Sequence, residues 1–471
     1  MIKPGNLDLR GLGFFRHRKV GERYLLTNEA GEHILLGEDE FTAFVEGRIR
    51  KESYLYSSLR QKHFFADNTT QKELTRRYAC KYKYVQAGTS LHIVIPTLRC
   101  NQRCIYCHAK AQTCSREGYD MDEQTARLVV DRIFESPSAR IALEFQGGEP
   151  LLNWDILVFI TRYALRKNKT HRKNLRLILV SNLTLMDEER YGFLTKHGFS
   201  ICSSLDGPRF IHDRHRPMLN GRSAYDEATP WIKRFFKDSP GFGSSALITL
   251  TRFSLGFPKE IIHEYLRWGM LNIPLRPVSV LGYAGERRKT FGITAEEYLK
   301  FYYRALDYIL ELNRITGERV SERMAGVCLQ KIFGASDPGY MDLRSPCGAG
   351  CGQLAYFYDG SVYTCDEARM LGDDSFKLGN VHTHSYRDLM QSANMKAATL
   401  SSCLDGLYCD YCAYKPYCGM CPVVNWKEYG SLFAQPNVSF TCKVNKGMFD
   451  YIFRALQDRE KERILKSWIG L

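Results

Sequence analysis

Three cysteines, Cys100, Cys104 and Cys107, lie within one stretch of eight residues. An odd number of thiols at this tight spacing leaves one over from any disulfide pairing, so metal ligation is the better interpretation. The stretch follows a β-like run at residues 91–98 and precedes polar, helix-prone residues. A loop wrapped round an iron–sulfur cube can supply three thiolates and leave the fourth iron open. The pattern therefore predicts a cluster that could hold a small molecule at its open iron.

A second group of cysteines lies near the carboxyl end of the chain. Its eight members would suffice for two four-iron clusters, each held entirely by protein. Zinc is the alternative, because the Cys409-x2-Cys412 and Cys418-x2-Cys421 pairs also suit a tetrahedral zinc ribbon. The five remaining cysteines are interpreted as buried or incidental thiols. The eight are Cys347, Cys351, Cys365, Cys409, Cys412, Cys418, Cys421 and Cys442.

The composition is that of a globular protein with a basic surface. The 471 residues are 44% hydrophobic and 25% charged, with a formal charge of +14. No run approaches the ~18 apolar residues of a membrane span, and the first residues lack the apolar core of a secretion signal. We expect a cytoplasmic protein, in which the sixteen cysteines stay reduced and the clustered ones bind metal. The positive charge suits a solvated surface or an acidic peptide better than nucleic acid, because no Lys/Arg block carries interleaved aromatic residues.

Alternating strand and helix patterns begin at residue 91. Six strand-then-helix units predict an α/β fold, a parallel sheet curled into a partial (β/α)6 TIM barrel. Chemistry in such barrels lies at the carboxyl ends of the strands, and the three-cysteine loop follows the first strand. The expected strands are residues 92–98, 140–146, 175–182, 200–206, 244–251 and 272–279, and the expected helices are 122–135, 154–167, 188–197, 223–237, 259–268 and 294–313.

Five regions are expected along the chain. Residues 1–88 read as short strands followed by helices, a small α+β unit of winged-helix type. The barrel occupies 89–316, and 317–345 bridges it to the next region. Residues 346–442 are glycine-rich and cysteine-dense, which suits a domain held by metal rather than by a large apolar core. One amphipathic helix is expected over 443–471.

The three-cysteine motif, with Tyr106 before its last member, resembles the signature of the radical S-adenosylmethionine (SAM) enzymes. Gly147-Gly148-Glu149-Pro150 ends the second expected strand and resembles the motif that binds the amino group of the methionine in that family. Glycines allow a backbone to approach a ligand closely, and carbonyls can accept hydrogen bonds from an ammonium group. The alternative is a simple turn from strand to helix.

Further resemblances fall at later strand ends. Ser181 and Asn182 end the third expected strand, and Ser204 lies at the end of the fourth. The resemblance implies that Ser181, with Asn182 beside it, faces the ribose or the carboxylate of SAM. Leu275-Arg-Pro277, at the sixth strand, resembles the adenine-side edge. Taken singly, such polar residues are more often helix caps or surface groups.

Arg216 is similar to the arginine that pairs with the methionine carboxylate in this family. A guanidinium suits this task because its planar fork binds a carboxylate through two hydrogen bonds. Arg214 and His215 lie close by in the sequence and are alternatives.

The carboxyl-terminal cysteines resemble a SPASM domain, an accessory module of many radical SAM enzymes that modify peptides and proteins. This chain departs from the usual pattern in the spacing of Cys418 from Cys421 and of Cys347 from Cys351. The resemblance implies a first auxiliary cluster on Cys347, Cys351, Cys365 and Cys421, and a second on Cys409, Cys412, Cys418 and Cys442.

Asp366 directly follows Cys365. In related sulfatase maturases an aspartate in this place takes a proton from the substrate, so the resemblance implies that Asp366 is a general base. A turn or capping carboxylate is the equal alternative.

From about residue 10 to the last cysteine, the chain most closely resembles the His-Xaa-Ser system radical SAM maturases of the HxsB type. Many such maturases carry an amino-terminal leader-peptide recognition element, a role that residues 10–88 would fit. The residues behind the resemblance are Arg23-Tyr-Leu-Leu-Thr-Asn-Glu-Ala-Gly, Glu144-Phe-Gln-Gly-Gly-Glu-Pro-Leu-Leu-Asn, Ser181-Asn-Leu-Thr, Ser204-Leu-Asp-Gly-Pro, Asp366-Glu-Ala-Arg-Met-Leu and Leu378-Gly-Asn-Val-His.

The resemblance implies an enzyme that takes a hydrogen atom from a ribosomally made precursor peptide and installs a modification, with a side-chain crosslink favoured. Its cofactors would be one [4Fe-4S] cluster that binds SAM and two auxiliary [4Fe-4S] clusters. Its partners would be a precursor peptide with its leader, an external electron donor and, as a further option, a second radical SAM maturase of the same system.

Two rival functions remain open from the sequence. A protein maturase would oxidise a cysteine or serine of an enzyme precursor to a formylglycine-type product. A zinc-bound scaffold would recruit partners without catalysis.

Overall fold

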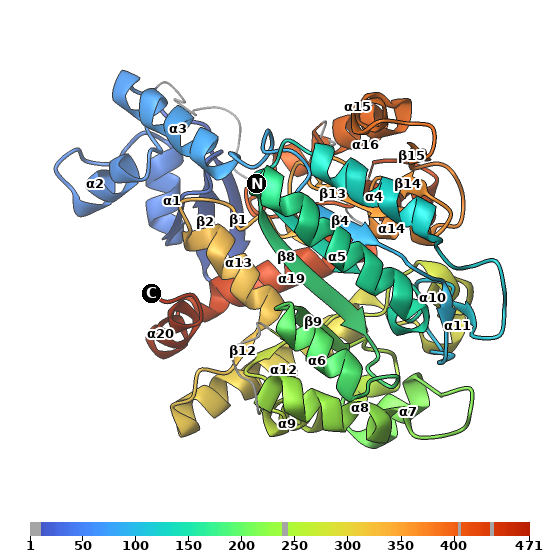
Figure 1. Cartoon of the computed structure of the whole chain (residues 1–471). Coiled ribbons are helices and arrows are strands. Elements are labelled where there is room, and N and C mark those ends of the chain that lie inside the picture. The colour runs from blue at the N-terminus through green and yellow to red at the C-terminus, as the bar shows by residue number, and fades with distance from the viewer. Residues whose placement is uncertain (1–10, 238–243, 404–406, 434–437) are drawn as a thin grey trace.

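The computed structural model describes residues 11–237, 244–403, 407–433 and 438–471 (Figure 1). The first ten residues of the expected amino-terminal unit lie outside this range. No helix within it is long and apolar enough to cross a bilayer.

The core of the fold is a mixed sheet of eight strands in the order β10-β9-β8-β7-β4-β13-β14-β15. Five of the six expected strands lie in it, and neighbours among them pair in parallel, as predicted. They are β4 (Leu91–Val94), β7 (Arg140–Phe145), β8 (Asn174–Ser181), β9 (Ser200–Ser204) and β10 (Ser245–Leu247).

The sixth expected strand is not part of this sheet. Residues 272–279 form only β11 (Asn272–Ile273), which pairs with β12 (Ser321–Glu322). The chain beyond it joins the barrel through a single parallel bridge between Leu250 and Pro277. Pro274 and Pro277 explain the difference, because proline has no N–H to donate to a neighbouring strand.

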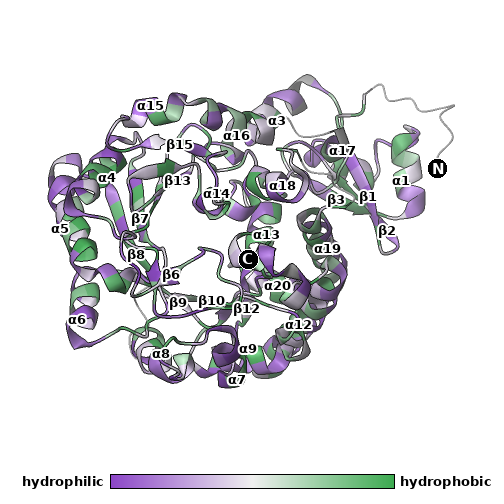
Figure 2. Cartoon of the chain, turned by 90° about the vertical axis from the view of Figure 1, so that its right-hand side faces the viewer, coloured by the Kyte–Doolittle hydropathy of each residue, from purple (hydrophilic) through white to green (hydrophobic). Residues whose placement is uncertain are grey.

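Helices surround the strands (Figure 2). On β7 the alternate residues Ile141, Leu143 and Phe145 are buried in the main apolar core, so Glu144 projects from the opposite, inner face. The barrel helices are α4 (Glu123–Glu135), α5 (Trp154–His171), α6 (Glu188–Lys196), α7 (Arg209–His215), α8 (Ala224–Ile232), α9 (Pro258–Arg267) and α12 (Ala295–Thr316).

The sheet continues from the barrel into the cysteine-rich region. Strand β13 (Gln353–Tyr356) pairs in parallel with β4, and β14 (Ser361–Tyr363) and β15 (Lys377–Asn380) follow it antiparallel. His92 on β4 and Tyr356 on β13 are joined by a hydrogen bond of 3.1 Å between Nδ1 and the phenol oxygen. The first cysteine loop and the second cysteine group therefore extend from one continuous sheet (Figure 1).

The amino-terminal unit has the expected order of strands followed by helices. Its antiparallel strands are β1 (Arg16–Val20), β2 (Arg23–Thr27) and β3 (His33–Leu36), and its helices are α1 (Glu38–Val45), α2 (Tyr54–Gln61) and α3 (Asn68–Lys81). Leu26 on one sheet face packs in a core with Phe41 and Phe44 of α1. Leu25, on the other face, belongs to the core of the main body. The sheet therefore lies between its own helices and the rest of the chain.

The carboxyl-terminal segment forms two helices rather than the single one expected. Helix α19 (Phe440–Ala455) is followed by α20 (Arg459–Ser467). The break occurs because Asp458 caps α20, its Oδ1 accepting from the backbone N–H of Glu460 at 2.9 Å. The other elements are β5 (Arg99–Cys100), β6 (Gln112–Thr113), α10 (Gly282–Glu286), α11 (Arg288–Phe291), α13 (Arg323–Phe333), α14 (Asp366–Met370), α15 (Tyr386–Gln391), α16 (Ala393–Cys403), α17 (Leu407–Asp410) and α18 (Pro422–Tyr429).

Candidate functional site

The first cysteine loop places nitrogen donors beside its sulfur atoms. The backbone N–H of Gln102 lies 3.4 Å from Cys100 Sγ, and that of Ala111 lies 3.5 Å from Cys107 Sγ. Burial raises the pKa of Cys104 to about 12, so this thiol does not ionise at neutral pH without a cation. N–H donors aimed at sulfur suit cluster-bound thiolates. The donor set therefore fits an iron–sulfur cluster.

A cavity adjoins this loop. It measures about 790 Å³, counted to its open mouth, and Cys104 and Cys107 form part of its wall with Arg103 and Arg116. Gln102 also lines it, and its buried Nε2 has no hydrogen-bond partner among the described residues. An unsatisfied buried donor costs free energy, so a bound polar group would stabilise it. This cavity fits a polar ligand beside the cluster.

Gly147 and Gly148 bring the end of β7 against the chain that enters the cysteine loop. A Cβ on Gly148 would lie 2.2 Å from the Arg99 carbonyl oxygen, and one on Gly147 would lie 2.3 Å from that of Thr97. The Gly148 N–H donates to the Thr97 carbonyl at 2.9 Å. Only residues without a side chain allow this approach. The motif thus sets the position of the loop as well as its own turn.

Glu149 connects the ends of β7 and β8. Its buried carboxylate accepts from Ser181 Oγ at 2.8 Å, from the Asn182 N–H at 2.9 Å and from the Leu151 N–H at 3.1 Å. Burial raises the pKa of Glu149 to about 7, and the hydrogen bonds from Asn182 and Ser181 oppose this rise. Asn182 Nδ2 lies 4.0 Å from Cys100 Sγ. The structure therefore brings Glu149, Ser181 and Asn182 together at the cysteine loop.

Arg216 is paired with Asp206. Its Nε donates to Asp206 Oδ2 at 3.0 Å, and its Nη1 lies 3.9 Å from Cys104 Sγ. The Tyr106 hydroxyl also donates to Asp206, and the Tyr106 ring centroid lies 5.4 Å from the guanidinium carbon. Burial alone would raise the pKa of Asp206, but the charge of Arg216 and the neighbouring His215 outweigh it and lower the pKa. A fixed positive charge results beside the first cysteine loop.

Asp206 was not among the site residues predicted from the sequence, although it lies two residues after Ser204 in the strand-end motif. Ser204 itself ends β9 opposite Leu247 of β10 and is half-buried. Of the alternatives to Arg216, His215 is buried with Nδ1 3.4 Å from Asp206 Oδ2, whereas Arg214 lies over the Phe253 ring.

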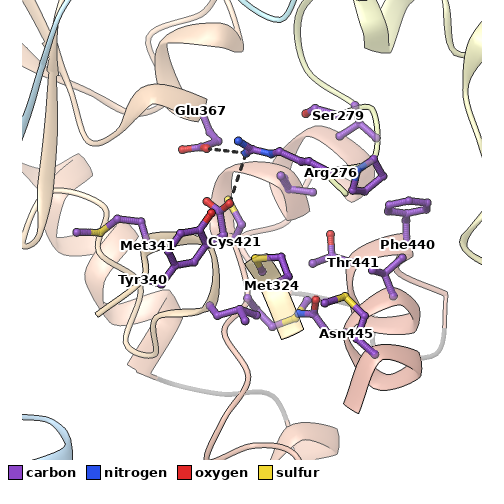
Figure 3. A pocket seen from close by; sticks show the side chains of 18 of the residues that line it. Arg276, Ser279, Met324, Tyr340, Met341, Glu367, Cys421, Phe440, Thr441 and Asn445 are labelled. Atoms are coloured by element: carbon purple, nitrogen blue, oxygen red, sulfur yellow. Dashed lines mark ion pairs between the residues drawn. The ribbon is translucent and has the colours of Figure 1, made fainter. Parts of the chain in front are cut away.

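Three of the carboxyl-terminal thiols line one shared cavity. Cys347, Cys365 and Cys421 share a space of about 1350 Å³, counted to its open mouth, between the barrel and the cysteine-rich region (Figure 3). The Ala349 N–H lies 3.4 Å from Cys347 Sγ, and the Ala368 N–H lies 3.3 Å from Cys365 Sγ. These N–H groups again suit thiolates.

Cys351, expected in the same ligand set, lies apart from that cavity wall. Its Sγ donates to the Cys347 carbonyl at 3.3 Å and lies 3.8 Å from Arg344 Nη2. The structure therefore places it next to Cys347 but does not bring it to the lining that the other three share.

The remaining four thiols line one smaller cavity of about 530 Å³. They are Cys409, Cys412, Cys418 and Cys442, the four that the resemblance groups in the second auxiliary cluster. Asn445 Nδ2 donates toward Cys418 Sγ at 3.4 Å. Across the described part of the chain, no three His, Cys, Asp or Glu side chains converge as the ligands of a single metal ion do.

Charged residues that the sequence analysis did not assign to the site lie in the cavity that Cys347, Cys365 and Cys421 share. Arg276 Nη2 is 3.5 Å from Asp342 Oδ2 and 3.9 Å from Glu367 Oε1 (Figure 3). Asp366, the expected general base, instead accepts from Arg369 Nε at 2.7 Å and is not part of the cavity lining. The Leu275-Arg-Pro277 stretch was the available signal for Arg276, whereas Asp342 and Glu367 had none.

Comparison with known proteins finds similarity that includes most of the barrel. Residues 94–263 match the radical SAM superfamily. The cysteine-type anaerobic sulfatase-maturating enzyme of Clostridium perfringens strain 13 is 26% identical over 370 residues, covering 76% of this chain and 94% of that protein. The Fe-coproporphyrin III synthase of Methanosarcina barkeri is 34% identical over 134 residues, covering 28% of this chain and 30% of that protein.

Solved structures share the fold. The structure of native anSMEcpe with bound AdoMet has a TM-score of 0.68 at 20% identity, covering 79% of this chain and 100% of that one. SuiB of Streptococcus suis bound to its precursor peptide SuiA has a TM-score of 0.53 at 14% identity, covering 89% of this chain and 97% of that one. The superfamily implies a [4Fe-4S] cluster and SAM as cofactors.

Proposed function

We propose that this radical SAM enzyme modifies a ribosomally made precursor peptide, as the HxsB-type maturases do, and joins two of its side chains. The observation that carries the proposal is the cavity of about 1350 Å³ between the barrel and the cysteine-rich region. Its wall combines apolar side chains such as Val278 and Met324 with the charged Arg276 and Glu367, which suits a peptide segment. Solved relatives with the same fold hold peptides, namely SuiA on SuiB and Cp18Cys on anSMEcpe.

In this proposal Cys100, Cys104 and Cys107 hold the cluster to which SAM binds. The cluster and SAM together supply the one-electron chemistry that removes a hydrogen atom from carbon. The protein's part is to fix the surroundings. Gly147 and Gly148 set the position of the loop, and Arg216 places its positive charge where it favours thiolates and a carboxylate.

Ser181, Asn182 and Ser204 lie along the same edge of the sheet, at the ends of β8 and β9. They remain the proposed contacts to SAM, with Tyr106 and Glu149 supporting them. Glu149 holds Ser181 and Asn182 by hydrogen bonds of 2.8 and 2.9 Å, so its part is to fix these two residues.

The two auxiliary clusters are proposed on the remaining eight cysteines. Cys347, Cys365 and Cys421 line the peptide cavity, with Cys351 as the fourth ligand of that set. Cys409, Cys412, Cys418 and Cys442 line the smaller cavity and form the second set. An auxiliary cluster at the cavity wall could accept the electron that the peptide loses when its side chains are joined.

Asp366 is proposed as the general base; its carboxylate accepts from Arg369 and does not line the cavity. Glu367, the next residue in the sequence, does line the cavity. The matched pair Asp366→Asn and Glu367→Gln separates their roles, since each removes one ionisable carboxyl with little change of shape. Asp366→Asn should abolish turnover of the precursor while Glu367→Gln mainly raises KM. The reverse result would transfer the role of the base to Glu367.

Residues 11–88 are proposed as the leader-binding element. Strand β3 is an outer strand, paired with β2 on one side, so its other edge can accept an extended peptide through main-chain hydrogen bonds. Lys62, which donates to the His33 carbonyl at 2.8 Å, puts a positive charge at this edge and suits an acidic leader. Hydrogen exchange with leader peptide alone tests this: β3 amides should be protected, and equal turnover of precursors with and without leader would contradict it.

The mass of the product tests the function. The anaerobically prepared enzyme, with a precursor encoded beside its gene, should yield a peptide that has lost two hydrogens and contains a crosslink detectable by fragmentation. The sulfatase-maturating relatives favour a second candidate, oxidation of cysteine to an aldehyde, which instead removes the thiol. Zinc without iron or acid-labile sulfide would exclude both reactions.

A further inference from the structure

We infer that the amino-terminal unit is a structural part of the second auxiliary-cluster site. Residues 409–418, here called the ligand loop, carry three of the four thiols that line the smaller cavity. Strand β1 contacts α19, which carries the fourth thiol, and side chains of β1 and β2 bond to this loop (Figure 2). The inference builds on the second ligand set of the proposed function and adds what holds that set in place.

Two side chains of the unit bond to backbone carbonyls between the thiols. Arg16 Nε, on β1, donates to the Asp410 carbonyl at 2.7 Å. The buried Thr27 Oγ1, on β2, donates to the Ala413 carbonyl at 2.8 Å. Because these bonds end on the main chain next to Cys409 and Cys412, they fix the path of the ligand loop itself.

The turn between β2 and β3 holds the far end of the loop. The buried Tyr417 hydroxyl, next to Cys418, donates to the Gly31 carbonyl at 2.7 Å. A Cβ on Gly31 would lie 3.1 Å from Tyr417 Cε1 and 3.3 Å from Pro416 Cβ, so the two segments are in close contact. Gly31 has a φ of +81°, a backbone conformation that residues with a side chain rarely adopt.

An ion pair joins β1 to the helix of the fourth thiol. Arg18 Nε and Nη2 donate to the two carboxylate oxygens of Asp450 at 2.8 and 2.7 Å. Asp450 also accepts from the hydroxyl of Tyr414, in the ligand loop. A bidentate pair of this kind fixes orientation as well as distance. Arg18 thus holds α19 and the ligand loop at one point.

The loop is therefore a layer between the amino-terminal unit and the thiols. On its outer side lie Arg16, Thr27 and Gly31, and on its inner side Asn445 donates toward Cys418 Sγ at 3.4 Å. A cluster that orders the loop must also favour docking of the unit, and by linkage docking must favour retention of the cluster. A leader peptide bound to this unit would act on the same equilibrium.

Iron release from the reconstituted full chain tests one direction. Arg18→Met removes the ion pair, and Thr27→Val removes a hydroxyl with little change of volume. In both variants about one third of the iron, the share of one cluster in three, should pass to a chelator roughly 10-fold faster than it does in the wild type. Lys19→Met is the matched control, because Lys19 is the next residue on β1 and pairs with Glu38 of its own unit at 3.1 Å. Wild-type release from both variants, or equal acceleration of all the iron, would overturn the inference.

Hydrogen exchange tests the other direction. Cys412→Ser should speed exchange of the β1 and β2 amides about 10-fold, whereas Cys365→Ser, in the first auxiliary set, should leave them unchanged. Unchanged β1 and β2 amides in Cys412→Ser would refute the coupling. Neither measurement uses a precursor, so an enzyme that fails to modify any peptide but shows both effects would contradict only the proposed function.

Discussion

Asp206 holds Arg216 beside Cys104, with its Oδ2 3.0 Å from Arg216 Nε. Both side chains are buried, and Asp206 also accepts from the Thr249 N–H at 3.0 Å. The pair therefore contacts both the barrel interior and the cysteine loop.

Asp206→Asn should destabilise the enzyme by about 3–5 kcal/mol, because it leaves a buried guanidinium without its counter-charge. Urea denaturation of the variant measures this loss. Glu188→Gln is the control, since it removes the exposed carboxylate that pairs with Arg234 and should cost less than about 1 kcal/mol. A loss for Asp206→Asn no larger than that of the control would contradict the buried pair.

Gly148→Ala should displace the cysteine loop, because the new Cβ would overlap the Arg99 carbonyl next to Cys100. We expect loss of about one third of the iron, measured with acid-labile sulfide after reconstitution. Gly192→Ala, on α6 with no atom within 4 Å of the new Cβ, should keep all of it. Full iron content in both variants would show that the loop tolerates the displacement.

The free energy of unfolding should decrease as the pH is lowered, because His92 is buried in its neutral form. Burial lowers the pKa of His92 to about 3. Below about pH 6.5 the unfolded chain protonates His92, whereas the folded chain keeps it neutral. Protonation therefore favours the unfolded chain, and the free energy of unfolding decreases as the pH falls from about 6.5 to 3. The loss reaches about 4 kcal/mol at the lower limit. In denaturation series across this range, His92→Gln should show a flatter slope, and an unchanged slope would exclude His92 as a source.

Glu149→Gln should cost about 1–3 kcal/mol despite its similar shape. Whichever way the amide turns, its NH2 group faces a backbone N–H, that of Leu151 or that of Asn182. Chemical denaturation compares it with Glu189→Gln on the exposed surface of α6, which should be near neutral. Equal stabilities would mean that Glu149 is not the acceptor that connects β7 and β8.

The local pattern of the sequence was enough to predict five of the six barrel strands, whereas the grouping of the cysteines was taken from the resemblance to a family. Alternating apolar residues in β7 and β8 report which face is buried, and this information is local. The prediction of the sixth strand was wrong because Pro274 and Pro277 have no backbone N–H to donate, although the hydropathy of the segment is that of a strand. The pairing of β13 with β4 could not be predicted, since it joins residues far apart in the chain through backbone groups common to every sequence.

For the site, too, local sequence features were predictable and tertiary contacts were not. Cysteine spacing indicated metal binding and the resemblance supplied the ligand sets, and in the structure Cys409, Cys412, Cys418 and Cys442 line one cavity. Which charged group faces a cavity depends on tertiary packing, so Glu367 and Asp342 were missed and the pairing of Asp366 with Arg369 was not foreseen. Arg216 was chosen for a ligand carboxylate, yet the chain supplies its own carboxylate from Asp206.

The pairing of β13 with β4 makes the barrel an incomplete unit by itself. A chain ending at residue 345 would leave β4 at the rim of the sheet, with the N–H and C=O groups of Leu91–Val94 bare along one side. Unprotected rims of this kind attract strands from other molecules and promote aggregation. We therefore expect a chain shortened at this point to aggregate, so the barrel and the cysteine-rich region must be expressed together.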